Sequence, residues 1–473
     1  MQKILTLGPE NWLAGLVIAD DYAGGGGTFI SADGFDIFRE PGLLQTGYLQ
    51  SELATIASTP MWFRPTMENS SSEAYVYAYC LNGNLYKIDV NNATGSGIDS
   101  VVDVSAEIIT SNSQGQGFAI GKAFNDATIA MVYSKNTDIR MNAVPPASGT
   151  DASIGTVTNS PYHPIHFSGV DKEFYIGDLN EVDAWDGTTY RTNVLDLDDD
   201  LTITSLSDDD KYLVIGATNN PTQVLAKSRS KVFFWNTWSP SWQREWDIPD
   251  TNLSAILKDG QKFYAFGRNG VWEFDLYTAP RFVFQKQTST TTYDFAPKAG
   301  GVDIWKGMLT WASANETAIK AYGSPDNRLP KAFFSPFAAF TAPQALHAVR
   351  EMKLYVGDNS KGYVLKTGNQ TGVVATTPYI PLGNRWKIGM VKMVTSKLAS
   401  GEKIAVTVKN DTGLNSIISG DHDVEGDTQG KVYDKGTATD HRAEQVQIGL
   451  TFTGAVKLKR LEIWGTPDPV KEA

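Results

Sequence analysis

The sequence predicts an all-β protein: an irregular β-propeller of about seven blades, followed by a C-terminal β-sandwich or jelly-roll domain. Three observations predict this class. A strand–turn–strand hairpin recurs along 55–372, longer strands fill 373–473, and helical spacing of apolar residues is nearly absent. The chain of 473 residues is longer than one hydrophobic core usually serves, so more than one domain or a repeat array is expected. Its 43 glycines suit tight turns, and its 11% aromatic residues suit the pleated faces of strands.

Residues 1–54 are expected to form an N-terminal arm ahead of the propeller. They lack the recurring hairpin, and the consecutive glycines Gly24 to Gly27 supply a joint with little preference for one backbone conformation. We interpret this run as a hinge that lets the arm lie away from the body. A surface loop is the alternative interpretation of the same residues.

The spacing of the hairpin predicts the propeller in 55–372. In the clearest copy, apolar strands at 353–357 and 363–366 flank a polar turn. Related copies occupy 74–89, 173–185 and 262–274. The hairpin centres lie roughly 40 to 50 residues apart, which is long enough for the four short strands of one blade. Because the units near Ile129 and Leu309 match weakly, six or eight blades are alternatives to seven.

The pattern changes after Gly372, where the strands become longer. The longest apolar-rich segments lie at 386–394, 403–409, 444–452 and 456–464. Strands of this length within about 90 residues predict a separate sandwich or jelly-roll domain. Its strands carry lysines that contrast with the acidic propeller, and we interpret them as the ordinary protection of exposed sheet edges.

Composition limits the partners of the chain. A formal charge of −12 disfavours tight binding to nucleic-acid phosphates, but it permits double-stranded DNA to pass an acidic surface without specific binding. The single cysteine, Cys80, excludes an intrachain disulfide and fits assembly in a reducing cytoplasm. No apolar stretch approaches the roughly 18 residues of a membrane span, and the apolar run at the start is too short for a signal peptide.

The common catalytic and metal-binding motifs are missing from the sequence, so we expect a non-enzymatic protein without a cofactor or metal. His163 and His166 lie three residues apart, and an extended chain places such residues on opposite faces. The acidic runs 196–200, 208–210 and 421–427 lack a complete calcium loop. We interpret them as solvated loops, with Ca²⁺ binding as the alternative.

Aromatic residues gather once, between 231 and 246. The cluster contains Trp235, Trp238, Trp242 and Trp246. One interpretation is a platform on which sugar rings stack, because flat apolar faces suit aromatic side chains. The interpretation that we favour is two blade strands whose tryptophans fill the space between neighbouring blades.

The segment 35–44, FDIFREPGLL, resembles the N-terminal segment of propeller proteins that form the tail nozzle or hub of short-tailed bacteriophages, also described as packaged-DNA stabilisation proteins. The order of parts is similar too: an arm, an irregular propeller, and a sandwich opened by 384–387 and closed by 459–464. The resemblance covers most of the chain in architecture and a few short motifs in sequence. The Gly24 to Gly27 run departs from the pattern of that family.

This resemblance implies a structural virion protein of the viral tail, assembled in the host cytoplasm. Its subunits would form a homo-oligomeric ring beside adaptor, fibre or needle proteins. The ring would extend the DNA channel and retain the genome until DNA ejection. We expect assembly contacts in the arm and the sandwich, at Phe35, Phe38, Arg39, Pro41, Gly42, Trp386 and Trp464.

Two other functions fit a propeller of this composition. A carbohydrate-binding or glycan-cleaving propeller would use the tryptophan cluster and paired acids. A cellular protein-interaction propeller would capture a partner on one face.

Overall fold

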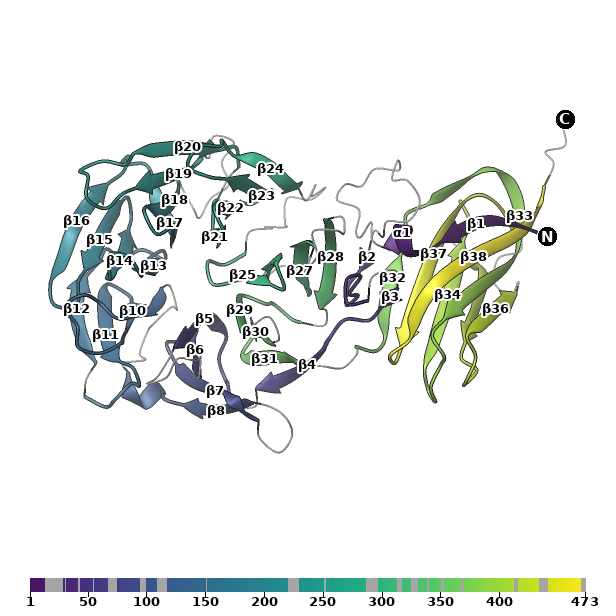
Figure 1. The fold of residues 1–473 in the computed structure, drawn as a ribbon, viewed down its shortest axis with the longest axis horizontal. Coiled ribbons are helices and arrows are strands. Elements are labelled where there is room, and N and C mark those ends of the chain that lie inside the picture. The colour runs from purple at the N-terminus through teal and green to yellow at the C-terminus, as the bar shows by residue number, and fades with distance from the viewer. Residues whose placement is uncertain are drawn as a thin grey trace.

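The computed structural model consists of a ring of small sheets joined to one larger sheet (Figure 1). It describes residues 1–12, 29, 31–40, 43–53, 55–66, 75–93, 99–108, 117–149, 151–219, 229–250, 252–285, 297–312, 317–324, 331–337, 340–349, 353–366, 370–411, 416–433 and 441–468. The predicted class, an all-β propeller of seven blades with a sandwich-like C-terminal domain, is confirmed. No helix in these ranges is long and apolar enough to cross a membrane.

Each blade is a four-stranded antiparallel sheet. Blade 1 is β5 (Pro60–Thr66), β6 (Tyr75–Cys80), β7 (Leu85–Ala93) and β8 (Asp99–Asp103), followed by the 3-10 helix η1 (Ser105–Glu107); blade 2 is β9 (Phe118–Gly121), β10 (Ala130–Lys135), β11 (Asp138–Ala143) and β12 (Ala152–Thr156); blade 3 is β13 (Ile165–Ser168), β14 (Glu173–Asp178), β15 (Glu181–Trp185) and β16 (Tyr190–Asp196); blade 4 is β17 (Thr202–Asp208), β18 (Leu213–Thr218), β19 (Ser230–Trp235) and β20 (Arg244–Ile248); blade 5 is β21 (Ala255–Asp259), β22 (Lys262–Phe266), β23 (Gly270–Phe274) and β24 (Arg281–Gln285); blade 6 is β25 (Val302–Trp305), β26 (Met308–Trp311), β27 (Ile319–Gly323) and β28 (Ala332–Phe337); blade 7 is β29 (Ala345–Val349), β30 (Lys353–Asp358), β31 (Lys361–Lys366) and β4 (Leu49–Leu53).

The middle strands of the blades form because the sequence supplies short, nearly continuous apolar runs. All six residues of β18 are buried, since neighbouring blades cover both faces of its sheet. The turn between β25 and β26 has Lys306 at φ 51° and Gly307 at φ 70°, the left-handed pair that a tight two-residue hairpin requires. Apolar runs and short turns together set the repeating unit.

The ring closes through the N-terminal part of the chain. The inner strands β5, β9, β13, β17, β21, β25 and β29 contact one another in succession, and β29 contacts β5 again. The outer strand of blade 7 is β4, whose residues Leu49 to Leu53 pair with β31 some 310 residues later in the chain. Leu53 is fully buried in the core that blades 7 and 1 share. One early strand therefore seals the last blade.

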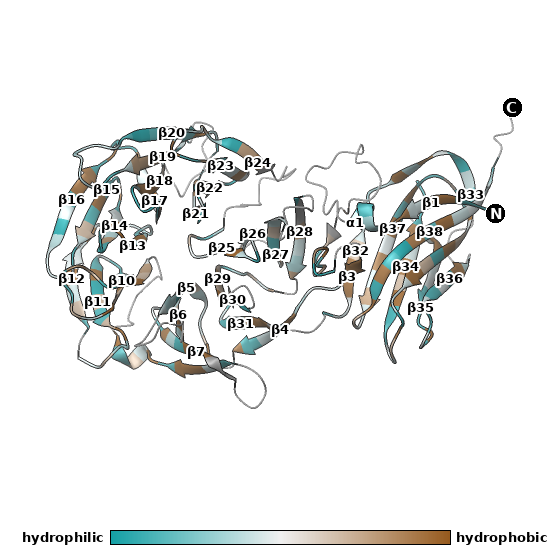
Figure 2. Ribbon diagram, in the orientation of Figure 1, coloured by the Kyte–Doolittle hydropathy of each residue, from teal (hydrophilic) through white to brown (hydrophobic). Residues whose placement is uncertain are grey.

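The larger sheet has ten antiparallel strands and includes the beginning of the chain. Its strands are β1 (Gln2–Leu7), β2 (Ser31–Ala32), β3 (Leu44–Gln45), β32 (Val373–Thr376), β33 (Ile380–Thr395), β34 (Lys403–Lys409), β35 (Ser416–His422), β36 (Gln429–Tyr433), β37 (Arg442–Thr453) and β38 (Lys457–Pro467), and the short helix α1 (Pro9–Trp12) follows β1. Strand β34 alternates buried and half-buried residues, as expected of a sheet with one face on a core. Apolar and polar residues interleave along these strands (Figure 2).

The expectation of a free N-terminal arm is wrong for the strands that the structure describes. Strand β1 pairs with β38, β2 with β32 and β3 with β38. The apolar residues of these segments are buried in the core of the larger sheet, which stabilises the attachment. The Gly24 to Gly27 run lies outside the described residues.

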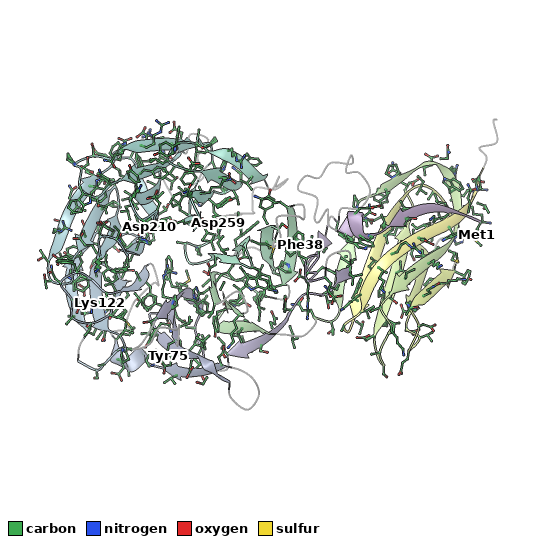
Figure 3. All side chains as sticks on the ribbon, in the orientation of Figure 1. Met1, Phe38, Tyr75, Lys122, Asp210 and Asp259 are labelled. Carbon is green, nitrogen blue, oxygen red and sulfur yellow. The ribbon has the colours of Figure 1, made fainter. Side chains whose placement is uncertain are left out.

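A wedge of N-terminal residues, 33–48, joins the propeller to the larger sheet. Phe35 contacts Phe452 of β37 edge to face at 5.1 Å between ring centroids, and Phe38 contacts Phe334 of blade 6 in the same manner at 5.3 Å. Asp33 adds an ion pair of 2.8 Å with Lys320 of β27. Figure 3 labels Phe38 where the two parts meet. A single hydrophobic core spans blade 6, the wedge and the larger sheet.

Closure of the ring by β4 predicts unequal effects for two leucines on one strand. Leu53→Ala should lower the free energy of unfolding by about 2–5 kcal/mol, because it opens a cavity in a closed core. Leu49→Ala is the matched control, since Leu49 is 45% exposed, and its effect should stay within about 0.5 kcal/mol. Denaturant unfolding measures both. Equal effects of the two substitutions would show that β4 does not seal the ring.

The wedge predicts coupled unfolding of the two parts. Phe38→Ala should cost about 3–5 kcal/mol and split a single calorimetric transition into two, because the shared core loses a ring that contacts blade 6. Phe124→Ala provides the control, as Phe124 is 72% exposed on blade 2. A Phe38→Ala protein that still unfolds in one transition with an unchanged Tm would contradict the role of the wedge.

Candidate functional site

The four tryptophans of the predicted cluster do not share one exposed surface. Trp235 is 2% exposed, packs edge-on against Tyr175 of blade 3, and its Nε1 donates to the carbonyl of Ser239 at 2.7 Å. Trp242 and Trp246 are half-buried, and Trp246 Nε1 donates to the Asp275 carbonyl of blade 5 at 3.0 Å. Trp238 alone is exposed, by 88%. Packing within and between blades therefore accounts for three of the four.

The predicted assembly contacts in the arm fall mostly inside the molecule. Phe35 and Phe38 are buried in the wedge, so their proposed role at a surface is wrong. Arg39 lies over the Tyr48 ring, 4.6 Å from its centroid. Pro41 and Gly42 lie outside the described residues. The apolar character that suggested an interface reflects the internal joint between the two parts.

The other two predicted contact residues lie on neighbouring strands of the larger sheet. Trp386 belongs to β33 and Trp464 to β38, and the two strands pair along most of their length. Both side chains are half-buried, and Trp464 Nε1 donates to Glu462 Oε2 at 3.2 Å. They therefore retain partial access to a partner.

One face of the propeller carries exposed apolar residues that the sequence patterns did not single out. Tyr277 is 87% exposed in the turn between β23 and β24 of blade 5. Trp238 lies in the corresponding turn of the neighbouring blade 4, between β19 and β20. Phe124 and Val170 are 72% and 56% exposed in the first turns of blades 2 and 3. Because strands alternate in direction, the first and third turns of a blade lie on one face. We call these four residues the apolar turn face.

The inner strands enclose a cavity of about 420 Å³ on the propeller axis. Its lining includes charged or titratable side chains from six of the seven blades. In blade order these are Arg64, His166, Asp208, Lys258, Asp303 and His347. Blade 2 instead contributes Ala119 and Ile120. We refer to this cavity as the axial channel.

Opposite charges in the axial channel meet across blade boundaries. His166 Nε2 of blade 3 lies 3.4 Å from Asp208 Oδ2 of blade 4, and His347 Nδ1 of blade 7 lies 3.2 Å from Asp303 Oδ2 of blade 6. The backbone N–H groups of Ile304 and Ala348 also donate to the Asp303 carboxylate, each at 2.7 Å. Each aspartate therefore joins two neighbouring inner strands.

Arg64 is held differently. Its guanidinium stacks on the Trp62 ring at 4.4 Å, and its Nη1 donates to the carbonyl of Phe63 at 3.1 Å. Burial lowers the pKa of Arg64 to about 10, against the opposing effect of the Asp303 charge. The guanidinium still carries a full charge at neutral pH. Among the described residues, no carboxylate lies within ion-pair distance of it.

The pKa of Asp208 is lower than that of an ordinary aspartate. Burial acts to raise it, but the interaction with His166, whose Nε2 lies 3.4 Å away, and the Lys258 charge outweigh burial. Lys258 Nζ also lies 3.6 Å from Asp210 Oδ2, in the turn that follows β17. The channel therefore keeps Asp208 ionised and fixed against its partners.

The predicted metal candidates have protein partners. Arg229 pairs with Asp200 at 2.6 Å, and the two ring nitrogens of His163 lie 3.0 and 3.1 Å from backbone carbonyls. Asp421 of the third acidic run pairs with Lys403 at 3.1 Å. Within the described ranges, no group of three or more His, Cys, Asp or Glu side chains is arranged to hold a metal ion.

Comparisons with known proteins find distant structural similarity and no match in sequence. No protein-family model matches the sequence, and no curated protein matches it. Among solved structures, the WD40 β-propeller domain of Doa1 has 8% identity over 68% of this chain and 97% of its own, with a TM-score of 0.48. The Neurospora crassa Pan2 WD40 domain has 11% identity over 69% and 96%, with a TM-score of 0.47. The computationally designed Ika8 protein has 14% identity over 68% and 99%, with a TM-score of 0.43.

The lowered pKa of Asp208 gives a pH-dependent prediction. Because the folded-state pKa lies below the unfolded one, the stabilisation is complete above the ordinary carboxyl value near 3.9 and is lost as the pH falls through the folded-state pKa. Asp208→Asn should therefore lower the free energy of unfolding at pH 7 by roughly 1–3 kcal/mol. That deficit should shrink below about pH 4, where the Asp208 carboxyl of the unfolded wild-type chain takes up its proton before the folded one does.

Urea unfolding at pH 7 and in the acid range measures this difference. Asp210→Asn is the control, because Asp210 is 79% exposed and its pair with Lys258 is screened by solvent. A deficit for Asp208→Asn that stays constant between pH 7 and pH 3 would rule out the ion pair as its cause.

Proposed function

We propose that this chain is a structural virion protein, a nozzle or hub subunit in the tail of a short-tailed bacteriophage. Copies of it form a homo-oligomeric ring that extends the channel for double-stranded DNA and retains the genome until ejection. The observation that carries this proposal is the unequal charge of the two ends of one rigid body. It favours head-to-tail contact between copies, the kind of contact that closes rings.

Most of the negative charge lies on the propeller. Residues 1–48 and 371–473, which include the larger sheet, carry 15 Lys and Arg against 18 Asp and Glu, whereas the propeller residues 49–370 carry 26 against 35. The lysines Lys387 and Lys397 are exposed on and beside β33 of the larger sheet. A nearly neutral, lysine-bearing end of one copy is therefore complementary to the acidic propeller of the next.

The rigidity of the body supports the same function. Wedge residues 33–48 contact both parts, and the chain continues directly into β4, which seals the propeller. A subunit in the wall of a conduit under pressure needs such a fixed relation between its parts. The net negative charge also suits a DNA conduit, because phosphates find few cations on which to lodge.

The apolar turn face supplies a surface for contact between copies. Trp238 and Tyr277 are almost fully exposed on neighbouring blades. Aromatic side chains are the residues that most often dominate interface energies when a partner buries them. We place one side of the contact between copies there and the other side on the larger sheet near Trp386 and Lys387, and we place contacts to adaptor, fibre or needle proteins near Trp464.

The ring predicts that removing both aromatics weakens self-association. Trp238→Ala/Tyr277→Ala should raise the concentration at which rings form by at least about tenfold, since each residue would lose more than about 1 kcal/mol of contact energy. Light scattering after gel filtration and negative-stain microscopy measure the ring. High salt should weaken the wild-type ring as well, because salt screens the complementary charges.

A matched variant on the opposite face of the propeller separates loss of the contact between copies from a general effect of removing exposed apolar side chains. Leu81 and Leu179 are 44% and 38% exposed in the second turns of blades 1 and 3, so Leu81→Ala/Leu179→Ala should leave the ring intact. A chain that stays monomeric at high concentration and joins no tail particle would refute the proposal. Stabilisation by sugars that depends on Trp238 would favour the carbohydrate-binding alternative instead.

A further inference from the structure

We propose that the axial channel binds a small oxyanion, of the phosphate or carboxylate class, between Arg64 of blade 1 and His347 of blade 7. These blades adjoin at the seam where the ring closes, and their inner strands β5 and β29 are in contact. Both side chains line the same cavity of about 420 Å³, a size suited to a small molecule. This inference is independent of the proposed ring of subunits.

Arg64 supplies the main cationic group of the site. A guanidinium has five N–H donors in a planar fork, and among the described residues one hydrogen bond, to the Phe63 carbonyl, engages it. The Trp62 ring holds the guanidinium plane at 4.4 Å and fixes its direction. The remaining donors match the spacing of two oxygens on one carboxylate or phosphate.

His347 supplies the second group. Its Nδ1 lies 3.2 Å from Asp303 Oδ2, and an ionised carboxylate accepts hydrogen bonds only, so Nδ1 carries a proton. Its Nε2 is buried and has no hydrogen-bond partner among the described residues. With the proton on Nδ1, Nε2 is an acceptor, and an oxyanion that retains one O–H, such as hydrogen phosphate, can donate to it.

The other charged groups of the channel already have protein partners, so they leave the position beside Arg64 and His347 to a ligand. Asp303 already accepts two backbone N–H groups besides the imidazole of His347. Asp208 is engaged by His166, and Lys258 is drawn toward Asp210 at the mouth of the channel. Arg64 and His347 therefore line the cavity from neighbouring inner strands, with the guanidinium as its cation that lacks an ion pair among the described residues.

The experiment titrates the full chain with inorganic phosphate and with acetate at constant ionic strength, using calorimetry and thermal shift. We expect saturable binding of at least one of the two anions. The two titrations distinguish phosphate from carboxylate. Absence of saturable binding by both anions would overturn the proposal.

Three variants assign the binding to these residues. Arg64→Met should weaken it at least tenfold, and Arg64→Lys, which keeps the charge and guards against a folding defect, should weaken it less. His347→Gln should weaken binding as well, because it removes the unpartnered ring nitrogen. Arg244→Met is the matched control, because Arg244 stacks on Trp246 at 3.8 Å in the same way but on the exposed outer strand β20. Equal weakening by Arg244→Met, or unchanged affinity in Arg64→Met, would refute the site.

Discussion

The whole arrangement depends on the wedge, in which two aromatic rings three residues apart face opposite partners. Phe35 packs on Phe452 of the larger sheet, and Phe38 packs on Phe334 of blade 6. The buried carboxylate of Asp36 turns the chain between them by accepting the N–H groups of Phe38 and Arg39 at 2.9 and 3.0 Å. Burial raises the pKa of Asp36, while these hydrogen bonds act to lower it. A polar group thus fixes the direction of two apolar contacts.

Ring closure follows from the wedge because the same stretch of chain runs on into β4. A strand that must pair with a partner some 310 residues away carries a substantial loop-closure entropy. Anchoring 33–48 in a shared core lowers that cost by placing β4 beside β31. Closure in turn brings Arg64 of the first blade next to His347 of the last, so the geometry of the axial channel depends on contacts made outside the propeller.

The sequence predicts the parts of the fold that are local. Apolar hairpins such as β30 and β31 are recognisable because both of their strands are buried and their turn is polar, and the longer alternating strands after Gly372 mark a different sheet. The pairings of β1 and β4 are not predictable in this way, because Gln2–Leu7 and Leu49–Leu53 are short, partly polar segments whose partners lie hundreds of residues away. The channel residues were missed because six of the inner strands each contribute a single charged or titratable side chain to the channel and the seventh contributes none. The sequence signal that could have found them is a charged or titratable residue on the strand just ahead of successive hairpins.

The charges of the channel follow the order of the blades. Around the axis, His166 of blade 3 meets Asp208 of blade 4, Lys258 of blade 5 follows, and Asp303 of blade 6 meets His347 of blade 7. Blade 2 contributes only the apolar Ala119 and Ile120, so Arg64 of blade 1 has an uncharged neighbour on one side. The guanidinium therefore lacks an ion-pair partner among the described residues, and the proposed oxyanion would supply one.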